Sequence, residues 1–215
     1  VKGWRVYITD NYIGVLDEQA FKLFNHQGKF LCNIGRTGQG PGEYKVLYGA
    51  TLNEKFDKIC LAPFYGKSLL EYNFRGEFLQ SIDVSVIVKG QVRYQPDGSL
   101  LLTHLQFANS PTFQYLHVDT TGIKTYINDD SKLISSIDEE GNFIGFNNEI
   151  WAGNNTSEFT YHIFETDTLY RFNPQTHKTY PRFALNKPFH PSAKSSSLSR
   201  EELLIGLNPL RSSSL

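Results

Sequence analysis

The sequence predicts an all-β fold assembled from tandem four-stranded antiparallel units. Aromatic residues make up 14% of the 215-residue chain, with 16 Phe and 12 Tyr, and such side chains favour the half-buried surface of a sheet. Short apolar runs alternate with polar turns, and three turns close on Gly28, Gly76 and Gly122. These glycines lie 48 and 46 residues apart. A period of about 45 residues with several strands per unit is typical of a β-propeller.

Each unit has an apolar strand, a variable link, a second strand ending in an aromatic or apolar residue, and a polar turn before another strand. The four units contain these runs: 12–17 with 21–31, 58–62 with 69–79, 98–102 with 115–123, and 148–152 with 168–174. A further strand is expected just upstream of three of them, at 49–52, 91–94 and 142–146. We therefore expect four blades from Tyr7 to about Leu185. A β-sandwich is the alternative, but sandwich strands rarely repeat one aromatic–turn–glycine order at a fixed period.

Two segments resemble a known family. Residues 34–44 read Ile-Gly-Arg-Thr-Gly-Gln-Gly-Pro-Gly-Glu-Tyr, and residues 23–30 read Leu-Phe-Asn-His-Gln-Gly-Lys-Phe. Together they resemble the NHL-like six-bladed β-propellers of gram-negative bacteria, over roughly residues 7 to 185. The resemblance implies six blades, of which four are visible here. It also implies a periplasmic or outer-membrane lipoprotein of unknown function, with no catalytic set to carry over.

The glycine-rich segment has two interpretations. A loop that cradles phosphate needs a helix N-terminus after it, so that free N–H groups face the anion. Here Pro41 interrupts the run, and Tyr44, Val46, Leu47 and Tyr48 favour a strand. We therefore expect a tight crossover from the outer strand of one blade to the inner strand of the next. Its structural residues are Gly35, Gly38, Gly40, Pro41 and Gly42.

Blade topology predicts where a ligand would bind. With strands a to d running from axis to rim, the d–a and b–c links share one face, and loops on a rigid scaffold commonly carry function. Arg36, Gln39 and Glu43 then lie on that face, where propellers bind ligands at the channel mouth. Arg93 and Tyr94 on an inner strand complete the candidate ligand-binding set.

The sequence contains no constellation that assigns a catalytic residue or a cofactor. The six histidines do not cluster, and the acidic pairs at 129–130 and 138–140 lie near turns. No Gly-x-Ser-x-Gly nucleophile elbow occurs. We expect no cofactor, with a single divalent cation on the propeller axis as the alternative.

Charge and cysteine content limit the classes of partner that this chain is expected to have. The net charge is −1 and no basic tract occurs, so nucleic acid is disfavoured. No apolar run approaches the roughly 20 residues of a membrane span. Cys32 and Cys60 lack metal-site spacing. They are interpreted as small buried apolar residues, with a disulfide as the alternative.

The domain boundaries are expected at 1–191 for the blades and 192–215 for a Ser-rich tail or insertion. Ser199 and Glu202 in that tail have the spacing of a capping box that would open a short helix. The chain begins at Val1 and contains no Met, so any signal sequence would lie outside it.

Three functions remain open. The first is an exported, non-enzymatic binding or scaffold propeller that recognises a peptide, glycan or small molecule at its channel mouth. The second is an NHL-like propeller enzyme, a metal-dependent lyase or lactonase. The third is a protein-interaction module, because an incomplete ring exposes strand edges that can pair with another chain.

Overall fold

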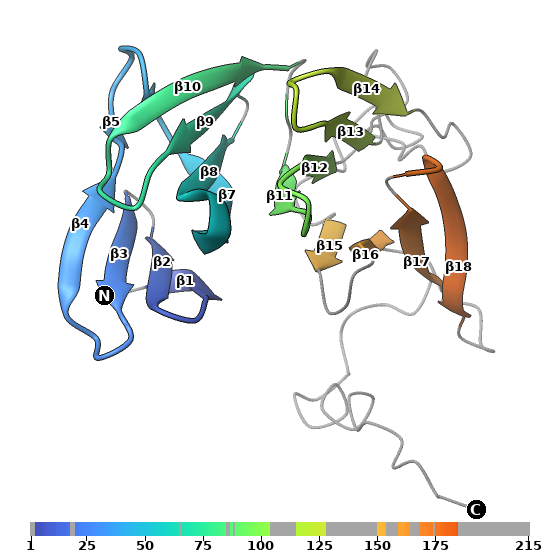
Figure 1. Ribbon diagram of the computed structural model, residues 1–215, viewed down its shortest axis with the longest axis horizontal. Helices are drawn as coiled ribbons and strands as arrows, with labels where there is room; N and C mark the ends of the chain where they lie inside the picture. Colours follow the sequence, from blue (N-terminus) through green and yellow to red (C-terminus); the bar gives the residue numbers. More distant parts are fainter. Residues whose placement is uncertain are drawn as a thin grey trace, which may run out of the picture.

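A computed structural model describes residues 3–17, 20–64, 66–84, 87, 89–103, 115–127, 150–153, 159–163, 168–173 and 175–184. These residues form four four-stranded antiparallel sheets and one two-stranded parallel pair. The four sheets follow one another as blades along an arc, with their first strands toward the inside of the curve (Figure 1). The predicted fold class, a β-propeller of four-stranded antiparallel blades, is confirmed.

The strands of each blade follow chain order from the inner to the outer edge. Blade 1 contains β1 (Gly3–Ile8), β2 (Tyr12–Asp17), β3 (Phe21–Asn25) and β4 (Phe30–Ile34). Blade 2 contains β7 (Leu47–Asn53), β8 (Lys58–Pro63), β9 (Ser68–Tyr72) and β10 (Phe78–Asp83), with the 3-10 helix η1 (Glu54–Phe56) after β7. Blade 3 contains β11 (Gln91–Tyr94), β12 (Leu100–Thr103), β13 (Tyr115–Val118) and β14 (Lys124–Ile127). Blade 4 contains β15 (Ile150–Gly153), β16 (Phe159–Ile163), β17 (Thr168–Asn173) and β18 (Lys178–Ala184).

Two details of the predicted blades need correction. The segment 148–152 was expected to be the second strand of blade 4, but β15 lies at the sheet edge and contacts the inner strand β11. The second strand is β16, whose Phe159 and Tyr161 side chains are buried against blade 3. Because polar residues precede it, this short strand did not stand out in the sequence. Blade 1 also begins earlier than Tyr7, since Gly3 already pairs with Asp17.

The turn between the third and fourth strands repeats in closely similar form. Gly28, Gly76 and Gly122 take positive φ angles of 77°, 84° and 88°, which glycine adopts without steric cost. Each turn also begins with an Asn or Asp whose Oδ1 accepts two backbone N–H groups. These residues are Asn25, Asn73 and Asp119. This side-chain cap explains why the same turn recurs at one period.

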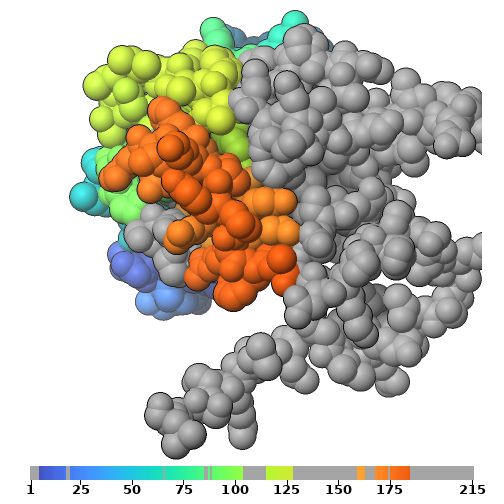
Figure 2. Space-filling model, turned by 90° about the vertical axis from the view of Figure 1, so that its right-hand side faces the viewer, coloured from blue at the N-terminus to red at the C-terminus, as the bar shows by residue number. Residues whose placement is uncertain are grey.

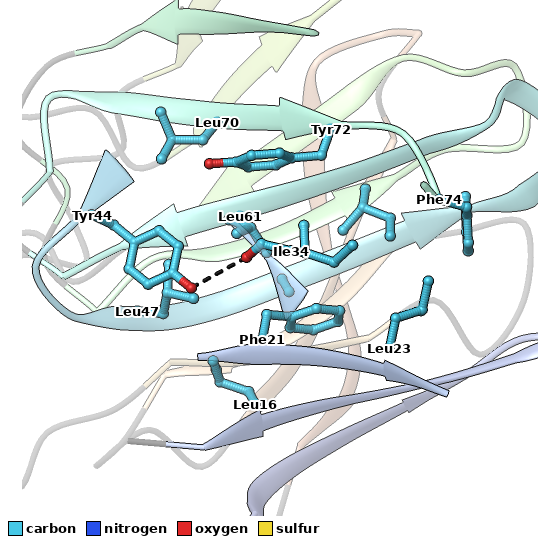
Figure 3. Packing of buried hydrophobic residues seen from close by; sticks show 12 residues of the cluster. Leu16, Phe21, Leu23, Ile34, Tyr44, Leu47, Leu61, Leu70, Tyr72 and Phe74 are labelled. Atoms are coloured by element: carbon cyan, nitrogen blue, oxygen red, sulfur yellow. Dashed lines mark hydrogen bonds between the residues drawn. The ribbon is translucent and has the colours of Figure 1, made fainter. Parts of the chain in front are cut away.

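The hydrophobic core lies between blades. A first cluster joins Leu16, Phe21 and Leu23 of blade 1 to Leu61 and Tyr72 of blade 2 (Figure 3). A second cluster joins blades 2 and 3, and a third joins blades 3 and 4. Figure 2 shows blade 4 in orange lying beside blade 3 in yellow-green. Each blade is therefore held by its neighbours, as in other repeat architectures.

The two cysteines are unpaired. Cys60 is fully buried and Cys32 is half-buried, and burial raises the pKa of both thiols. No helix among the described residues is long and apolar enough to cross a membrane. The expected strand at 142–146, the acidic pairs, His104, His190 and the tail 192–215 lie outside the described residues.

Candidate functional site

The loop from β4 to β7, residues 35–46, is the crossover between blades 1 and 2. Its two short strands, β5 (Arg36–Thr37) and β6 (Glu43–Tyr44), pair in parallel. Gly35 and Gly42 take φ angles of 68° and 70°. A Cβ at Gly42 would lie 2.7 Å from the Phe78 ring, and one at Gly38 would meet the Glu43 carboxylate. Glycine therefore permits both the turn and its close packing.

Glu43 organises this loop electrostatically. Its Oε2 accepts the Gly40 backbone N–H at 2.8 Å, and its Oε1 accepts Arg36 Nε at 2.5 Å. The Gly40 N–H first, and then the Arg36 guanidinium, lower the pKa of the Glu43 carboxyl. The Arg36 side chain remains 82% exposed, so the pair presents a fixed carboxylate beside a solvent-facing cation.

Two buried tyrosines anchor the loop to the core. Tyr44 donates its hydroxyl to the Ile34 carbonyl at 3.2 Å (Figure 3), and Tyr72 donates to the Gly42 carbonyl. Burial raises the pKa of both phenols. The loop is therefore held by neutral hydrogen-bond donors rooted in the interface of blades 1 and 2.

The crossover loop forms one wall of a pocket of about 310 Å³. The other wall is the β8–β9 turn of blade 2, so the pocket opens on the face that carries the crossover, here called the crossover face. We call it the crossover pocket. Its chemically distinctive lining residues are Gln39, Glu43, Lys45, Phe64, Lys67 and Ser68. The pocket offers a carboxylate, an amide, two ammonium groups and an aromatic ring within one small volume.

The structure places the predicted site residues in two separate groups. Gln39 and Glu43 line the crossover pocket, and Arg36 holds Glu43. Arg93 instead donates to the carbonyls of Ala50 and Val92 on the inner strands. Tyr94 is buried between blades 2 and 3. Consecutive strand residues point to opposite faces of a sheet, so Arg93 and Tyr94 do not share one surface.

The Tyr94 hydroxyl contacts a buried carboxylate that the sequence analysis did not single out. The Glu71 side chain is buried, with 2% of the residue exposed. Its carboxylate accepts hydrogen bonds from Tyr94 Oη and from Gln80 Nε2, each over 2.6 Å. Lys58 Nζ lies 3.3 Å from its Oε2. The sequence did hold a signal for this network, namely a single acidic residue inside the apolar run Leu69–Tyr72. A charge in such a run is expected to be buried, and buried charges require partners.

A histidine pair was also missed. His117 Nδ1 lies 3.3 Å from His177 Nε2, although the two residues are 60 positions apart. Burial, and then His177, lower the pKa of His117. Within the described part of the chain, no group of three or more His, Cys, Asp and Glu side chains is arranged to hold a metal ion.

Comparison with known proteins places the chain in a family and in a fold. The family described as "Domain of unknown function (DUF4934)" matches residues 2–210. No curated protein matches the sequence. Among solved structures, a protein of Bacteroides fragilis NCTC 9343 described as exported is similar with a TM-score of 0.61 and 19% identity, over 83% of this chain and 49% of that one.

Two further structures extend the comparison. A streptogramin B lyase gives a TM-score of 0.58 at 12% identity, over 85% of this chain and 54% of that one. An auxiliary nutrient binding protein of Bacteroides thetaiotaomicron VPI-5482 gives a TM-score of 0.51 at 11% identity, over 83% of this chain and 41% of that one. The chain thus spans about half the length of these structures. At such identities the likeness concerns the fold.

Proposed function

We propose that this chain, which belongs to the DUF4934 family, is part of an exported, non-enzymatic binding propeller that holds a small polar ligand in the crossover pocket. The observation that supports this most is the preorganised Glu43 carboxylate. Arg36 and the Gly40 N–H fix it, and two lysines and Phe64 surround the same space. Convergent polar groups around a small pocket with an aromatic wall are typical of ligand sites.

The ligand chemistry follows from the lining. Glu43 accepts hydrogen bonds, while Lys45, Lys67 and Ser68 donate them. Phe64 supplies an aromatic surface, and its ring is 5.8 Å from that of Tyr48. A glycan, a short peptide or another small molecule with both donors and acceptors would match this set. Gln39 and Glu43 would contact it directly, and Arg36 would position Glu43.

In this proposal the whole protein forms a closed ring of blades and is located in the cell envelope. The structural neighbours include exported and nutrient-binding proteins of Bacteroides, which supports export and a binding role. Four blades on an arc are compatible with a six-bladed ring in the whole protein. The resemblance to NHL-like propellers further supports a periplasmic or outer-membrane lipoprotein.

Binding to arrays of neutral and charged glycans and short peptides, followed by titration calorimetry with any probe retained, tests the proposal. Glu43→Gln and Gln39→Ala should weaken binding of that probe at least about tenfold, as expected for losing a hydrogen bond that involves a charged group. The matched control is Glu77→Gln. Glu77 also pairs with an arginine, Arg75, but it follows the β9–β10 turn at the other end of the blade. Equal affinity of all three variants would refute this site.

A propeller enzyme is the second candidate, because the fold is similar to that of a streptogramin B lyase. A lyase or lactonase of this type would hold a divalent cation on the propeller axis, where Arg93 and its inner-strand neighbours lie. Metal analysis of the purified protein separates the two candidates. A stoichiometric divalent ion that is lost when axis-facing residues are substituted would favour the enzyme over the binding protein.

A further inference from the structure

A second cleft, of about 380 Å³, lies between blades 2 and 3. The turns that surround it, η1, the β11–β12 turn and the β13–β14 turn, connect strands at the end of the blades opposite the crossover pocket. We call this end the hairpin face and the space the interblade cleft. It therefore lies at a different place from the site proposed above, and Ser81 is the one lining residue that the two spaces share.

The inner part of the interblade cleft is apolar, and polar groups line it on both the blade 2 side and the blade 3 side. Ile82, Leu100 and Val118 line it and are buried. On the blade 2 side, Lys58 and Gln80 line the cleft, and both contact the buried Glu71 carboxylate. The Glu71 network thus fixes an ammonium and an amide at the wall.

The blade 3 side contributes two carboxylates. Asp97 Oδ1 accepts the backbone N–H and hydroxyl of Ser99 at 2.9 and 2.7 Å. Asp119 Oδ1 accepts the N–H groups of Thr121 and Ile123, each at 2.9 Å. In both residues the turn uses Oδ1, whereas Oδ2 receives no hydrogen bond from the described residues. Burial raises the pKa of the Asp97 carboxyl, but the hydrogen bonds from Ser99 outweigh it and the pKa is lowered overall. The Thr121 hydroxyl lowers the pKa of the Asp119 carboxyl, so both groups are ionised at neutral pH.

An aromatic ring stands at the mouth of the cleft. Phe56, at the end of η1, is 41% exposed and lines the cleft beside Asp97 and Gly98. A Cβ at Gly98 would lie 2.8 Å from the Phe56 ring. Glycine at this position therefore lets the ring pack directly on the β11–β12 turn, next to the Asp97 carboxylate.

We propose that the interblade cleft binds a neutral saccharide. A sugar ring has an apolar C–H surface, which suits Phe56 and the apolar floor, and hydroxyls that both donate and accept hydrogen bonds. Asp97 and Asp119 accept from those hydroxyls, while Lys58 and Gln80 donate to them. The cleft volume lies within the range of small-molecule sites, roughly 300–1,000 Å³. The paired carboxylates disfavour an anionic ligand, and the nearby Lys58 and Lys124 disfavour a cation.

Titration calorimetry with a panel of neutral hexoses and hexose disaccharides tests this site. Asp97→Asn and Asp119→Asn remove the charge but keep an Oδ1 for the turn. For Asp119 the change is already found in the repeat, because Asn25 and Asn73 occupy its turn position in blades 1 and 2. The double variant should bind the best disaccharide at least about tenfold more weakly, as loss of charge-assisted hydrogen bonds requires. Phe56→Leu should weaken it independently.

Glu43→Gln in the crossover pocket separates the two proposals. Unchanged saccharide binding by this variant, together with loss in the Asp97 and Asp119 variant, supports the interblade cleft. Loss in Glu43→Gln with full binding by the cleft variants would place the sugar in the crossover pocket and overturn this inference. Failure of every sugar in the panel to bind at millimolar concentration would also overturn it, while leaving the crossover pocket open to other probes.

Discussion

The contact between Tyr94 and Glu71 gives the sharpest stability prediction, because it joins two blades through one buried hydrogen bond. Glu71 belongs to β9 of blade 2 and Tyr94 to β11 of blade 3, and the hydroxyl donates to the carboxylate over 2.6 Å. Tyr94→Phe removes one oxygen and leaves the ring in the second core cluster. The expected change is therefore that of the hydrogen bond, without a large cavity.

The size of the loss can be set from the surroundings of Glu71. A hydrogen bond to a charged group contributes about 1.5–3 kcal/mol. Glu71 keeps Gln80 and Lys58 as partners after the substitution, which favours the lower part of that range. We expect Tyr94→Phe to lower the free energy of unfolding by about 2 kcal/mol. For a chain of this size that corresponds to a fall in Tm of about 4–8 °C.

Urea unfolding of Tyr94→Phe, Glu71→Gln and the double variant measures the coupling between the two side chains. The control is Tyr180→Phe, whose residue is 38% exposed and should change stability by less than about 0.5 kcal/mol. If Tyr94→Phe matched this control, or if Glu71→Gln had the same effect with and without the Tyr94 hydroxyl, the buried bond would not hold the blades together.

Three further predictions concern the turns and the histidine pair. Because the pKa of His117 is lowered in the folded protein, the unfolded chain binds more protons, so the stability that His117 contributes is present above a pH of about 6.5 and is lost as the pH falls. His117→Gln should therefore make the urea midpoint depend less on pH between about pH 5 and 8, and an unchanged pH dependence would contradict this reasoning. Gly28→Ala should lower the free energy of unfolding by about 1–2 kcal/mol, because alanine is strained at a positive φ. Gly98→Ala should lower the melting temperature further, because its Cβ would also meet the Phe56 ring. Equal losses in the two variants would show that the contact with Phe56 is unimportant. Asn25→Ala should lose about 1–2 kcal/mol of unfolding free energy from two turn hydrogen bonds, while Asn25→Asp should stay close to the parent, since Asp serves in the blade 3 turn.

The blades could be predicted because each repeats a local requirement. A turn that needs a positive φ selects glycine, and this requirement recurs at Gly28, Gly76 and Gly122. The fourth blade breaks the rule, because Asn173 begins its turn and His177, not glycine, takes a φ of 54°. The local signal is therefore weaker in blade 4, the blade in which the second strand was also mispredicted.

The candidate site was predictable only in part. The crossover loop is contiguous in sequence, so Arg36, Gln39 and Glu43 could be grouped from their spacing alone. Arg93 and Tyr94 were grouped because they are adjacent, yet alternation along β11 sends their side chains to opposite faces. Which of two neighbours faces a site depends on strand register and blade packing, and a motif does not contain that information.

The interblade cleft shows why contact between units hides a site from sequence reading. Its two carboxylates lie in turns of blade 3, and each has a sufficient local role in accepting N–H groups of its own turn. Lys58 and Gln80 come from blade 2, where Glu71 accounts for both. Taken one blade at a time, every residue is explained by structure alone. A second role becomes visible only when neighbouring blades bring the remaining oxygens, the amide and the Phe56 ring to one space. Sites of this kind in repeat folds should therefore be sought at the junctions between units. There a side chain can hydrogen-bond within its own unit through one polar atom and still present a second polar atom to a ligand.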